Sequence, residues 1–500
     1  MDRRILEVDI AQSRVEERSV SVSSLYALEK SVIENLSGRI VLTFSGNILR
    51  ASYLSPRNGN RITETTSCEF ARVISQKGIS AVIISGKASK LSFLDISESG
   101  IEIHLCEKLK FSSPHTFKKL LGENPSDCFI SIGKAGEMKA PLSSLVLDTS
   151  FIFGHGGIGA VFGQMNLKGI ILRNRGEVKN KEREGKRKSK LRSRIDKEGW
   201  LTLVNEAFMN GWAPVKNFSG RKDPRLLHLS SANFERVMDR EEDAPIDLFS
   251  TFALGSNLGF FDPVKVQFLF EGCLALGLDP ISVGYVLANV KYQEKLEYPF
   301  PDLYNADVDD ILSLLDEMAE MKGFGELFNS LAIKLLEDKS FFPLCDLRGS
   351  LMMALSYALD DLYPFYADLA LGLSRKFSNK NIGLIYAYLR LYYLYQIDNG
   401  ISPDLALVSV SEILFKFVPD NAFLLRASLS SLVLGKMKDK ALAECALEKL
   451  SEEKLGNLPK FFTTTIGEND YTDEIKEKEL GVAYLLEIDI IRSRYEKKKK

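Results

Sequence analysis

A cluster of glycines between Gly154 and Gly163 is the segment of this sequence that is best suited to chemistry. It precedes a short apolar run that ends at Leu172. A glycine-rich turn that leads into a helix can bring backbone N–H groups close to an anion, because glycine tolerates positive φ and a helix N-terminus carries partial positive charge. A tight helix–strand junction would need the same glycines. From these residues alone, both interpretations remain open.

The cysteines lack the spacing of a metal site. No two of the six are closer than 22 residues in sequence, whereas zinc and iron–sulfur sites are typically built from cysteines two residues apart. We therefore expect them to be buried small hydrophobic residues. The six are Cys68, Cys106, Cys128, Cys273, Cys345 and Cys445.

The pattern of apolar residues changes along the chain and predicts an α+β fold. Residues 1–172 contain short β-branched runs and form a β-rich domain, whereas residues 200–340 and 341–500 show helical periodicity and form two all-helical domains. Between them, residues 173–199 form a basic linker, in which Arg173–Lys197 holds 12 Lys or Arg residues. The clearest predicted strands are Arg39–Phe44, Ala81–Ser85, Ile101–Leu105 and Cys128–Ile132; the clearest predicted helices are Val264–Leu276, Asp307–Met321 and Glu326–Glu337.

Composition and charge exclude several classes. No apolar run reaches the roughly 18 to 20 residues that a membrane-spanning helix needs, and the N-terminus has no apolar segment of the secretory type, so we expect a cytoplasmic protein without membrane contact. The net charge is −2. The basic stretch Arg173–Lys197 has no aromatic residue on which a base could stack, which favours a solvated loop over a nucleic-acid site.

Several segments together resemble one known family. The string Gly154-His155-Gly156-Gly157-Ile158-Gly159-Ala160-Val161-Phe162-Gly163 and the residues after it closely resemble the GRGGLGAVMGSKNLKAI motif of the aldehyde:ferredoxin oxidoreductases. Further resemblances follow in the family's order from residue 4 to residue 358. They include Ala81–Lys87 (AIIIEGK), Ser131–Glu137 (SIGPAGE), Ala253–Gly259 (ALGSNxGI) and Leu276–Gly284 (YGLDTISTG).

The resemblance implies a tungsten- or molybdenum-bis-pterin cofactor between the β-rich and helical domains. It places Gly156, Gly157 and Gly159 against the cofactor and matches Asp279 and Asp398 to the two acidic positions that hold the pterins. Each aspartate also has an ordinary structural interpretation. Asp279 precedes Pro280 and could cap a helix, and Asp398 opens an Asp-Asn-Gly turn. If the family arrangement persists, the glycine loop and both aspartates should face one cavity.

Departures from the family pattern fall on the positions that carry its chemistry. The segments that match the cluster-binding regions, Glu235–Ala244 and Asp398–Pro403, contain no cysteine, so we expect no iron–sulfur cluster. Ile48 stands at a cofactor-contacting arginine, and His155 replaces the arginine of the GRGG motif. Tyr366 stands where the family places a histidine beside the substrate. The catalytic residues are therefore unknown from the sequence.

Two functional hypotheses remain, and whether the chain is an enzyme stays open. We favour a divergent relative with impaired or lost catalysis that binds no cofactor and serves as partner or scaffold to a family homologue or redox partner. The alternative is an active bis-pterin oxidoreductase that oxidises aldehydes to carboxylic acids and passes electrons by another route. A weaker third hypothesis is nucleic-acid binding through the basic loop. A homo-oligomer also remains open.

Overall fold

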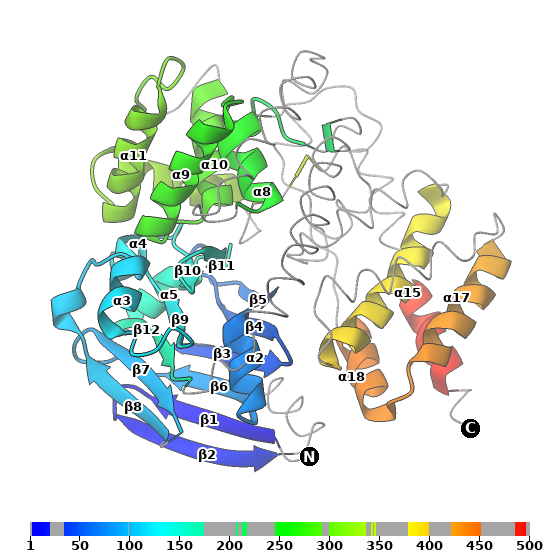
Figure 1. Cartoon of the computed structure of the whole chain (residues 1–500). Coiled ribbons are helices and arrows are strands. Elements are labelled where there is room, and N and C mark those ends of the chain that lie inside the picture. The colour runs from blue at the N-terminus through cyan, green and yellow to red at the C-terminus, as the bar shows by residue number, and fades with distance from the viewer. Residues whose placement is uncertain are drawn as a thin grey trace, which may run out of the picture.

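The computed structural model divides into a β-rich domain and two sets of helices (Figure 1). The predicted α+β class, with strands first and helices after, is confirmed. The structure describes residues 3–20, 35–98, 100–174, 207–208, 213–217, 246–292, 300–336, 342–343, 345–346, 379–399, 422–451 and 486–496.

Two six-stranded mixed sheets form the β-rich domain. Each contains one parallel pair, β1 with β6 and β12 with β7, among antiparallel neighbours, so neither sheet is doubly wound. The first sheet has the order β2 (Arg14–Val20), β1 (Arg3–Asp9), β6 (Ile79–Ser85), β3 (Arg39–Ser45), β4 (Ile48–Leu54) and β5 (Arg61–Ser67). The second has the order β11 (Phe151–Phe153), β10 (Leu145–Leu147), β9 (Cys128–Ser131), β12 (Leu167–Leu172), β7 (Ser92–Ser97) and β8 (Gly100–Leu105).

Short helices fill the β-rich domain between its strands. They are α2 (Glu69–Gln76), the 3₁₀ turn η1 (Glu107–Leu109), α3 (Pro114–Leu121), α4 (Lys134–Glu137) and α5 (Ile158–Gln164). Apolar residues of both sheets, of α2 and of α5 belong to one buried cluster that continues into the helical regions. The strands of the functional site, β4 and β5, are therefore anchored in the same core as the helices above them.

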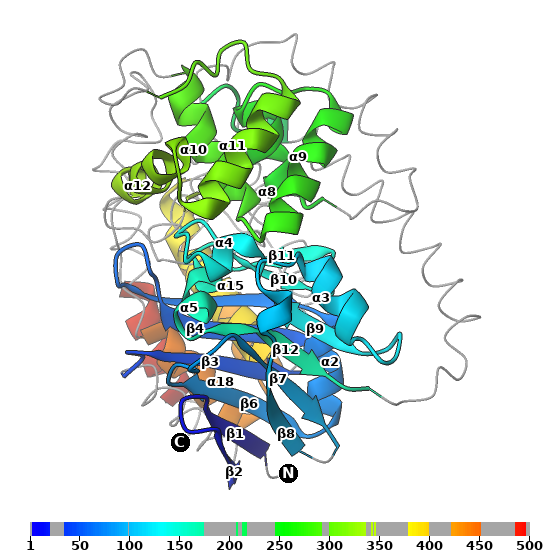
Figure 2. The ribbon, with the colours of Figure 1, turned by 90° about the vertical axis from the view of Figure 1, so that its left-hand side faces the viewer.

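Two helical regions follow the sheets in the chain. The first lies against the second sheet and comprises α8 (Leu248–Thr251), the π-helical turn η2 (Phe252–Asn257), α9 (Pro263–Leu276), α10 (Pro280–Tyr292), α11 (Val308–Glu320) and α12 (Phe324–Leu336), as Figure 2 shows. The C-terminal helices are α15 (Asn379–Asp398), α17 (Ala422–Lys436) and α18 (Lys440–Ser451). No helix among the described residues is both long and apolar enough to cross a membrane.

Local signals explain where the best-defined helices begin and end. Asp262 caps α9 ahead of a proline at its start, and Gly277 ends the helix at a positive φ of 70°. Asp307 and Asp310 form a capping box at the start of α11, whose apolar residues recur on one face. Gly277 also lies against Gly133, which brings the end of α9 onto the β-rich domain and fixes the next residues, Leu278 and Asp279.

The contact between α4 and α5 leaves no room for a side chain at Gly163. An added Cβ would overlap the carbonyl oxygen of Gly136. We expect Gly163→Ala to lower the free energy of unfolding by about 1–3 kcal/mol, because overpacking must shift the backbone. Gly435→Ala in α17 is the control: nothing lies within 4 Å of its added Cβ, so it should be neutral or slightly stabilising. Urea denaturation of both variants measures the difference, and equal stabilities would contradict the expectation.

Candidate functional site

The glycine loop joins β11 to α5, and two of its glycines adopt the positive φ that glycine tolerates. Gly154 and Gly157 have φ values of 100° and 90°. The loop is packed against other parts of the β-rich domain rather than facing open space. A Cβ on Gly157 would lie 2.7 Å from the carbonyl oxygen of Pro141 and 2.8 Å from Pro56, and a Cβ on Gly156 would overlap Ile62. Close protein packing therefore explains why glycine is needed here.

The anion that this loop binds is a carboxylate of the chain itself. Glu64, in β5, is buried and accepts hydrogen bonds from the backbone N–H of His155 at 2.8 Å and of Gly156 at 3.0 Å. The hydroxyl of Tyr53 donates a third hydrogen bond at 3.1 Å. Burial raises the pKa of Glu64, while the neighbouring His155 works in the opposite direction. Two backbone N–H groups of the loop therefore already donate to a carboxylate of the chain itself.

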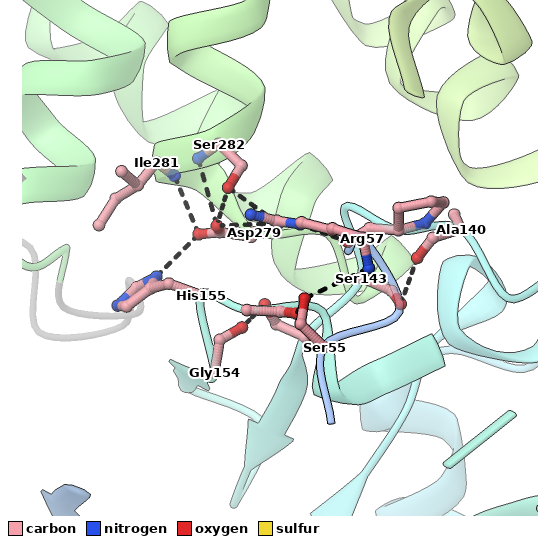
Figure 3. Close-up of polar contacts among 12 residues, drawn as sticks. Ser55, Arg57, Ala140, Ser143, Gly154, His155, Asp279, Ile281 and Ser282 are labelled. Atoms are coloured by element: carbon pink, nitrogen blue, oxygen red, sulfur yellow. Dashed lines mark hydrogen bonds and ion pairs between the residues drawn. The ribbon is translucent and has the colours of Figure 1, made fainter. Parts of the chain in front are cut away.

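Asp279 lies directly above this loop, at the start of α10 (Figure 3). Its oxygens accept hydrogen bonds from the backbone N–H groups of Ile281 at 3.2 Å and Ser282 at 3.3 Å, so it caps the helix as one sequence interpretation predicted. The Ser282 hydroxyl also contacts it. The Nδ1 atom of His155 lies 3.0 Å from Oδ1. The structure therefore brings Asp279 and the glycine loop together.

A second cation, Arg57, reaches the same carboxylate from the turn after β4. Its side chain is completely buried, and Nη2 lies 3.8 Å from Oδ2 of Asp279. Nη2 also donates to the hydroxyl of Ser282 at 3.0 Å, and Nε donates to the carbonyl of Pro141 at 2.9 Å. Ser55 fixes this turn because its Oγ accepts from the Arg57 N–H and donates to the carbonyl of Gly156.

Glu64, Asp279, His155 and Arg57 form one charge network, in which the His155 side chain is 19% exposed and the other three residues are buried. Burial alone would lower the pKa of His155, but the charge and hydrogen bond of Asp279, with Glu64, raise it to about 9. Burial alone would raise the pKa of Asp279, but His155 and Arg57 hold it below its usual value. Near pH 7 the network contains two cations facing Asp279, with Glu64 beneath the loop.

The raised pKa of His155 predicts how stability changes with pH. Its protonated form is favoured by folding, so its contribution is complete below the unfolded value of about 6.5 and is lost as pH rises through about 9. We expect the free energy of unfolding to fall between about pH 6.5 and 9. In His155→Gln this part of the decline should disappear. Urea denaturation at several pH values tests it, and identical pH profiles of the two proteins would refute the assignment to His155.

Asp398 lies in a different set of contacts, at the end of α15. Its Oδ1 is 3.3 Å from Nη2 of Arg50 in β4 and 2.8 Å from Nζ of Lys449 in α18. Its Oδ2 is buried and has no hydrogen-bond partner among the described residues. Burial alone would raise the pKa of Asp398, but Lys449 and Arg50 hold it below its usual value. Asp398 thus contacts neither the glycine loop nor Asp279, and whether a cavity links them stays a prediction.

The cysteines have the environment that the sequence predicted. Five of the six are buried, and Cys68 is partly buried. Burial raises the pKa of Cys68, Cys106 and Cys128 to about 12, which keeps them as unreactive thiols. Within the described ranges, no three His, Cys, Asp or Glu side chains are grouped to hold a metal ion.

Some predicted positions lie outside the described residues. They are Tyr366, Glu235–Ala244, all but the first two residues of Arg173–Lys197, and Gly400–Pro403. Arg173 itself is described and pairs with Asp95 and Asp127, where β12 ends. The expectations for these segments remain untested, as do the exact domain boundaries.

Sequence reasoning missed Glu64 and Arg57. In β5, Ile62 and Glu64 occupy the buried positions of an alternating strand. The alternation in the sequence therefore could have indicated a buried acidic residue. Arg57 gave no such signal, because an arginine in a Ser-Pro-Arg-Asn-Gly turn is ordinarily exposed.

Comparison with known proteins agrees with the resemblance found in the sequence. The family described as "Aldehyde ferredoxin oxidoreductase, N-terminal domain" matches residues 36–174, which run from just before β3 to the end of the second sheet. The tungsten-containing aldehyde ferredoxin oxidoreductase of Pyrococcus furiosus is 26% identical over 364 residues, covering 61% of this chain and 60% of that protein. Residues 36–174 therefore match the N-terminal domain of the aldehyde ferredoxin oxidoreductases, and a longer part of the chain is similar to a member of that family.

A second curated relative and a solved structure are also similar to this chain. The Pyrococcus furiosus protein named "Aliphatic sulfonate oxidoreductase, WOR-like subunit" is 25% identical over 362 residues, or 60% of this chain and 57% of that protein. The solved active-site complex BamBC of benzoyl coenzyme A reductase is 16% identical, with a TM-score of 0.55, and the alignment covers 99% of this chain and 90% of that one. The latter likeness concerns the fold alone. The chain spans about 60% of the length of the curated relatives it matches.

Most of the groups that the family resemblance assigns to the pterins are already hydrogen-bonded within the chain. A pterin ring would need free acceptors on the two aspartates and free N–H donors in the loop. The N–H groups of His155 and Gly156 bind Glu64, and both oxygens of Asp279 are occupied by donors of the chain. Of these groups, Oδ2 of Asp398 is the acceptor that remains free. Whether Gly156, Gly157, Gly159, Asp279 and Asp398 bind a cofactor therefore stays a prediction.

Proposed function

We propose that this chain is a family member that has kept the fold but holds no tungsten or molybdenum pterin, and that it acts as a partner or scaffold for a cofactor-bearing relative. The main support for the proposal is that the Asp279 carboxylate already has partners in the chain. It contacts His155 and Arg57 and accepts a hydrogen bond from the N-terminus of α10. A buried carboxylate that is fully hydrogen-bonded and neutralised gains nothing from a further donor, and it loses much if one of its partners is displaced.

The loss of cofactor-binding groups in the sequence supports the same proposal. Ile48 replaces a charged donor, and its side chain is buried in the core of the β-rich domain. Two of the similar proteins are by name a subunit and part of an active-site complex, which fits a chain that works within an assembly. We propose a family homologue or a redox partner as the associated protein.

Purification of the tagged chain from its native host tests the partner role. We expect a second protein of the same family, or a redox protein, to co-purify at a fixed ratio that survives gel filtration. The control is a chain with Asp279→Ala, which disturbs the first helical region. Recovery of the wild-type chain alone, at several salt concentrations, would contradict the partner role.

An active bis-pterin oxidoreductase is the second candidate, and the free Oδ2 of Asp398 favours it. A buried carboxylate oxygen without a donor costs free energy unless a ligand supplies one. In this case the chain would bind tungsten or molybdenum and oxidise aldehydes to carboxylic acids. Aldehyde-dependent reduction of an artificial dye by protein from the native host would support it. The absence of such activity in metal-replete protein would remove it.

A further inference from the structure

Strand β8 forms one edge of the second sheet and has few of the features that usually protect an edge. Among the described residues its one neighbour is β7, with which it pairs in an unbroken antiparallel register. Edge strands ordinarily carry charges that keep other strands away. The edge strand β2 of the first sheet follows this rule, since four of its seven residues are charged. In contrast, β8 contains a single acidic residue and no lysine or arginine, and it ends at Leu105, which is 66% exposed.

The outward backbone groups of β8 belong to Ile101, Ile103 and Leu105. The N–H of Cys106, the next residue, donates to the carbonyl of Leu91 at 2.8 Å, on the side of β7. The backbone groups of an antiparallel strand point alternately to one neighbour and to the other. Residues 105, 103 and 101 therefore direct their N–H and C=O groups away from β7, where a second strand can bind them.

The sequence of β8 complements itself when two copies run antiparallel with Ile103 at the centre. Ile103 then lies opposite Ile103 of the second copy, and Ile101 lies opposite Leu105. These residues carry the outward backbone groups, so they form the hydrogen-bonded pairs of the ladder. Glu102 lies opposite His104 of the second copy in a non-hydrogen-bonded pair, where side chains are closest. The two side chains are compatible, because Oε2 of Glu102 and Nε2 of His104 are already 3.2 Å apart within one copy.

A hollow beside β8 can receive a side chain from the second copy. It has a volume of about 310 Å³ and lies between the edge strands β2 and β8, which are neighbours in both views (Figures 1 and 2). Because a cavity of about 150 Å³ can hold benzene, the hollow has room for a leucine side chain. In the antiparallel register, Leu105 of the second copy lies beside Ile101, on the same face of the sheet. Apolar side chains from both sheets line the hollow: Leu6, Val15, Ile79, Ile96 and Ile101.

We propose that two copies of this chain associate through β8, with Leu105 of each copy inserted into the hollow beside Ile101 of the other. Two-fold symmetry follows from the register, since every contact is then made twice. A strand of an unrelated protein could use the same backbone groups, but it would not reproduce both pairs of Glu102 with His104. The inference goes beyond the proposed function and holds whether or not the chain binds a cofactor.

Sedimentation analysis of the purified chain over a range of concentrations tests the proposal. We expect a reversible equilibrium between monomer and dimer. Leu105→Arg should raise the dissociation constant of the dimer by about ten- to hundredfold, because the free energy of burying one leucine corresponds to one or two factors of ten. Leu486→Arg is the control, since Leu486 is 60% exposed and lies outside β8, and it should leave the dissociation constant unchanged. A wild-type chain that stays monomeric at every concentration, or a dimer that Leu105→Arg leaves intact, would overturn the proposal.

Two further sets of variants test the register of the pairing. His104→Glu places carboxylates opposite each other and should weaken the dimer, and adding Glu102→Lys to the same chain should restore it. Ile103→Cys should form a disulfide-linked dimer on mild oxidation, because residue 103 lies opposite itself, whereas Glu102→Cys should not. The wild-type chain gives the background from Cys68, which is partly buried. A double variant that dimerises no more tightly than His104→Glu alone, or equal cross-linking of the two cysteine variants, would show that β8 does not pair in this way and would overturn the proposal.

Discussion

Replacement of Asp279 by alanine is expected to lower the free energy of unfolding by about 3–5 kcal/mol, the usual cost of removing one partner from a buried ion pair. The change would leave Arg57 and His155 without the carboxylate that neutralises them, in a region where Arg57 is completely buried. It would also remove the cap of α10. Denaturation by urea near pH 7 measures the loss.

Asp307→Ala is the matched control, because Asp307 also caps a helix but has a 66% exposed side chain. Its loss should cost about 1 kcal/mol, the typical value of a cap. Asp279→Asn keeps an oxygen for the cap and removes the charge, so its cost should approach that of alanine. A loss for Asp279→Ala no greater than that for Asp307→Ala would show that the charge network contributes little.

The second large effect is expected at Lys168, in β12. Its side chain is fully buried, pairs with Glu137 of α4 and donates to the carbonyl of Ser112 at 2.8 Å. Burial lowers the pKa of Lys168. Lys168→Met should destabilise the protein by about 3–5 kcal/mol, because it leaves Glu137 buried without a cation.

A double variant separates the lost pair from lost packing. In Lys168→Met with Glu137→Gln, the glutamine oxygen can still accept the N–H of Phe111, which now binds Glu137 at 2.8 Å, and no charge remains unpaired. We expect the double variant to regain a large part of the stability, as measured by thermal and urea denaturation. A double variant less stable than Lys168→Met alone would mean that packing around the methylene chain decides the effect.

Local signals in the sequence were sufficient to predict most of the fold. Short β-branched runs predicted the strands that the structure shows as β3 and β6, and helical periodicity predicted α9 and α11. These features depend on residues a few positions apart, and one chain contains that information in full.

The site was predicted less completely because its decisive contacts are distant in sequence. Glycine was recognised as suited to a turn with positive φ, which Gly154 and Gly157 adopt, but the carboxylate that this loop binds is Glu64, about 90 residues earlier. Arg57 and Asp279 are paired across two domains by the packing of α10, which no local pattern encodes. A single sequence identifies candidates for such a network but not which of them meet.

The metal content of the chain purified from its native host is the most direct test of the proposed function. The cells are supplied with tungstate and molybdate, and the protein is purified without oxygen and analysed by elemental mass spectrometry. A cofactor-bearing relative from the same cells is analysed in parallel. We predict tungsten and molybdenum far below one atom per chain here and near stoichiometric metal in the relative. Close to one atom of either metal in this chain would contradict the proposal, because Asp279 would then have to exchange its protein partners for a cofactor.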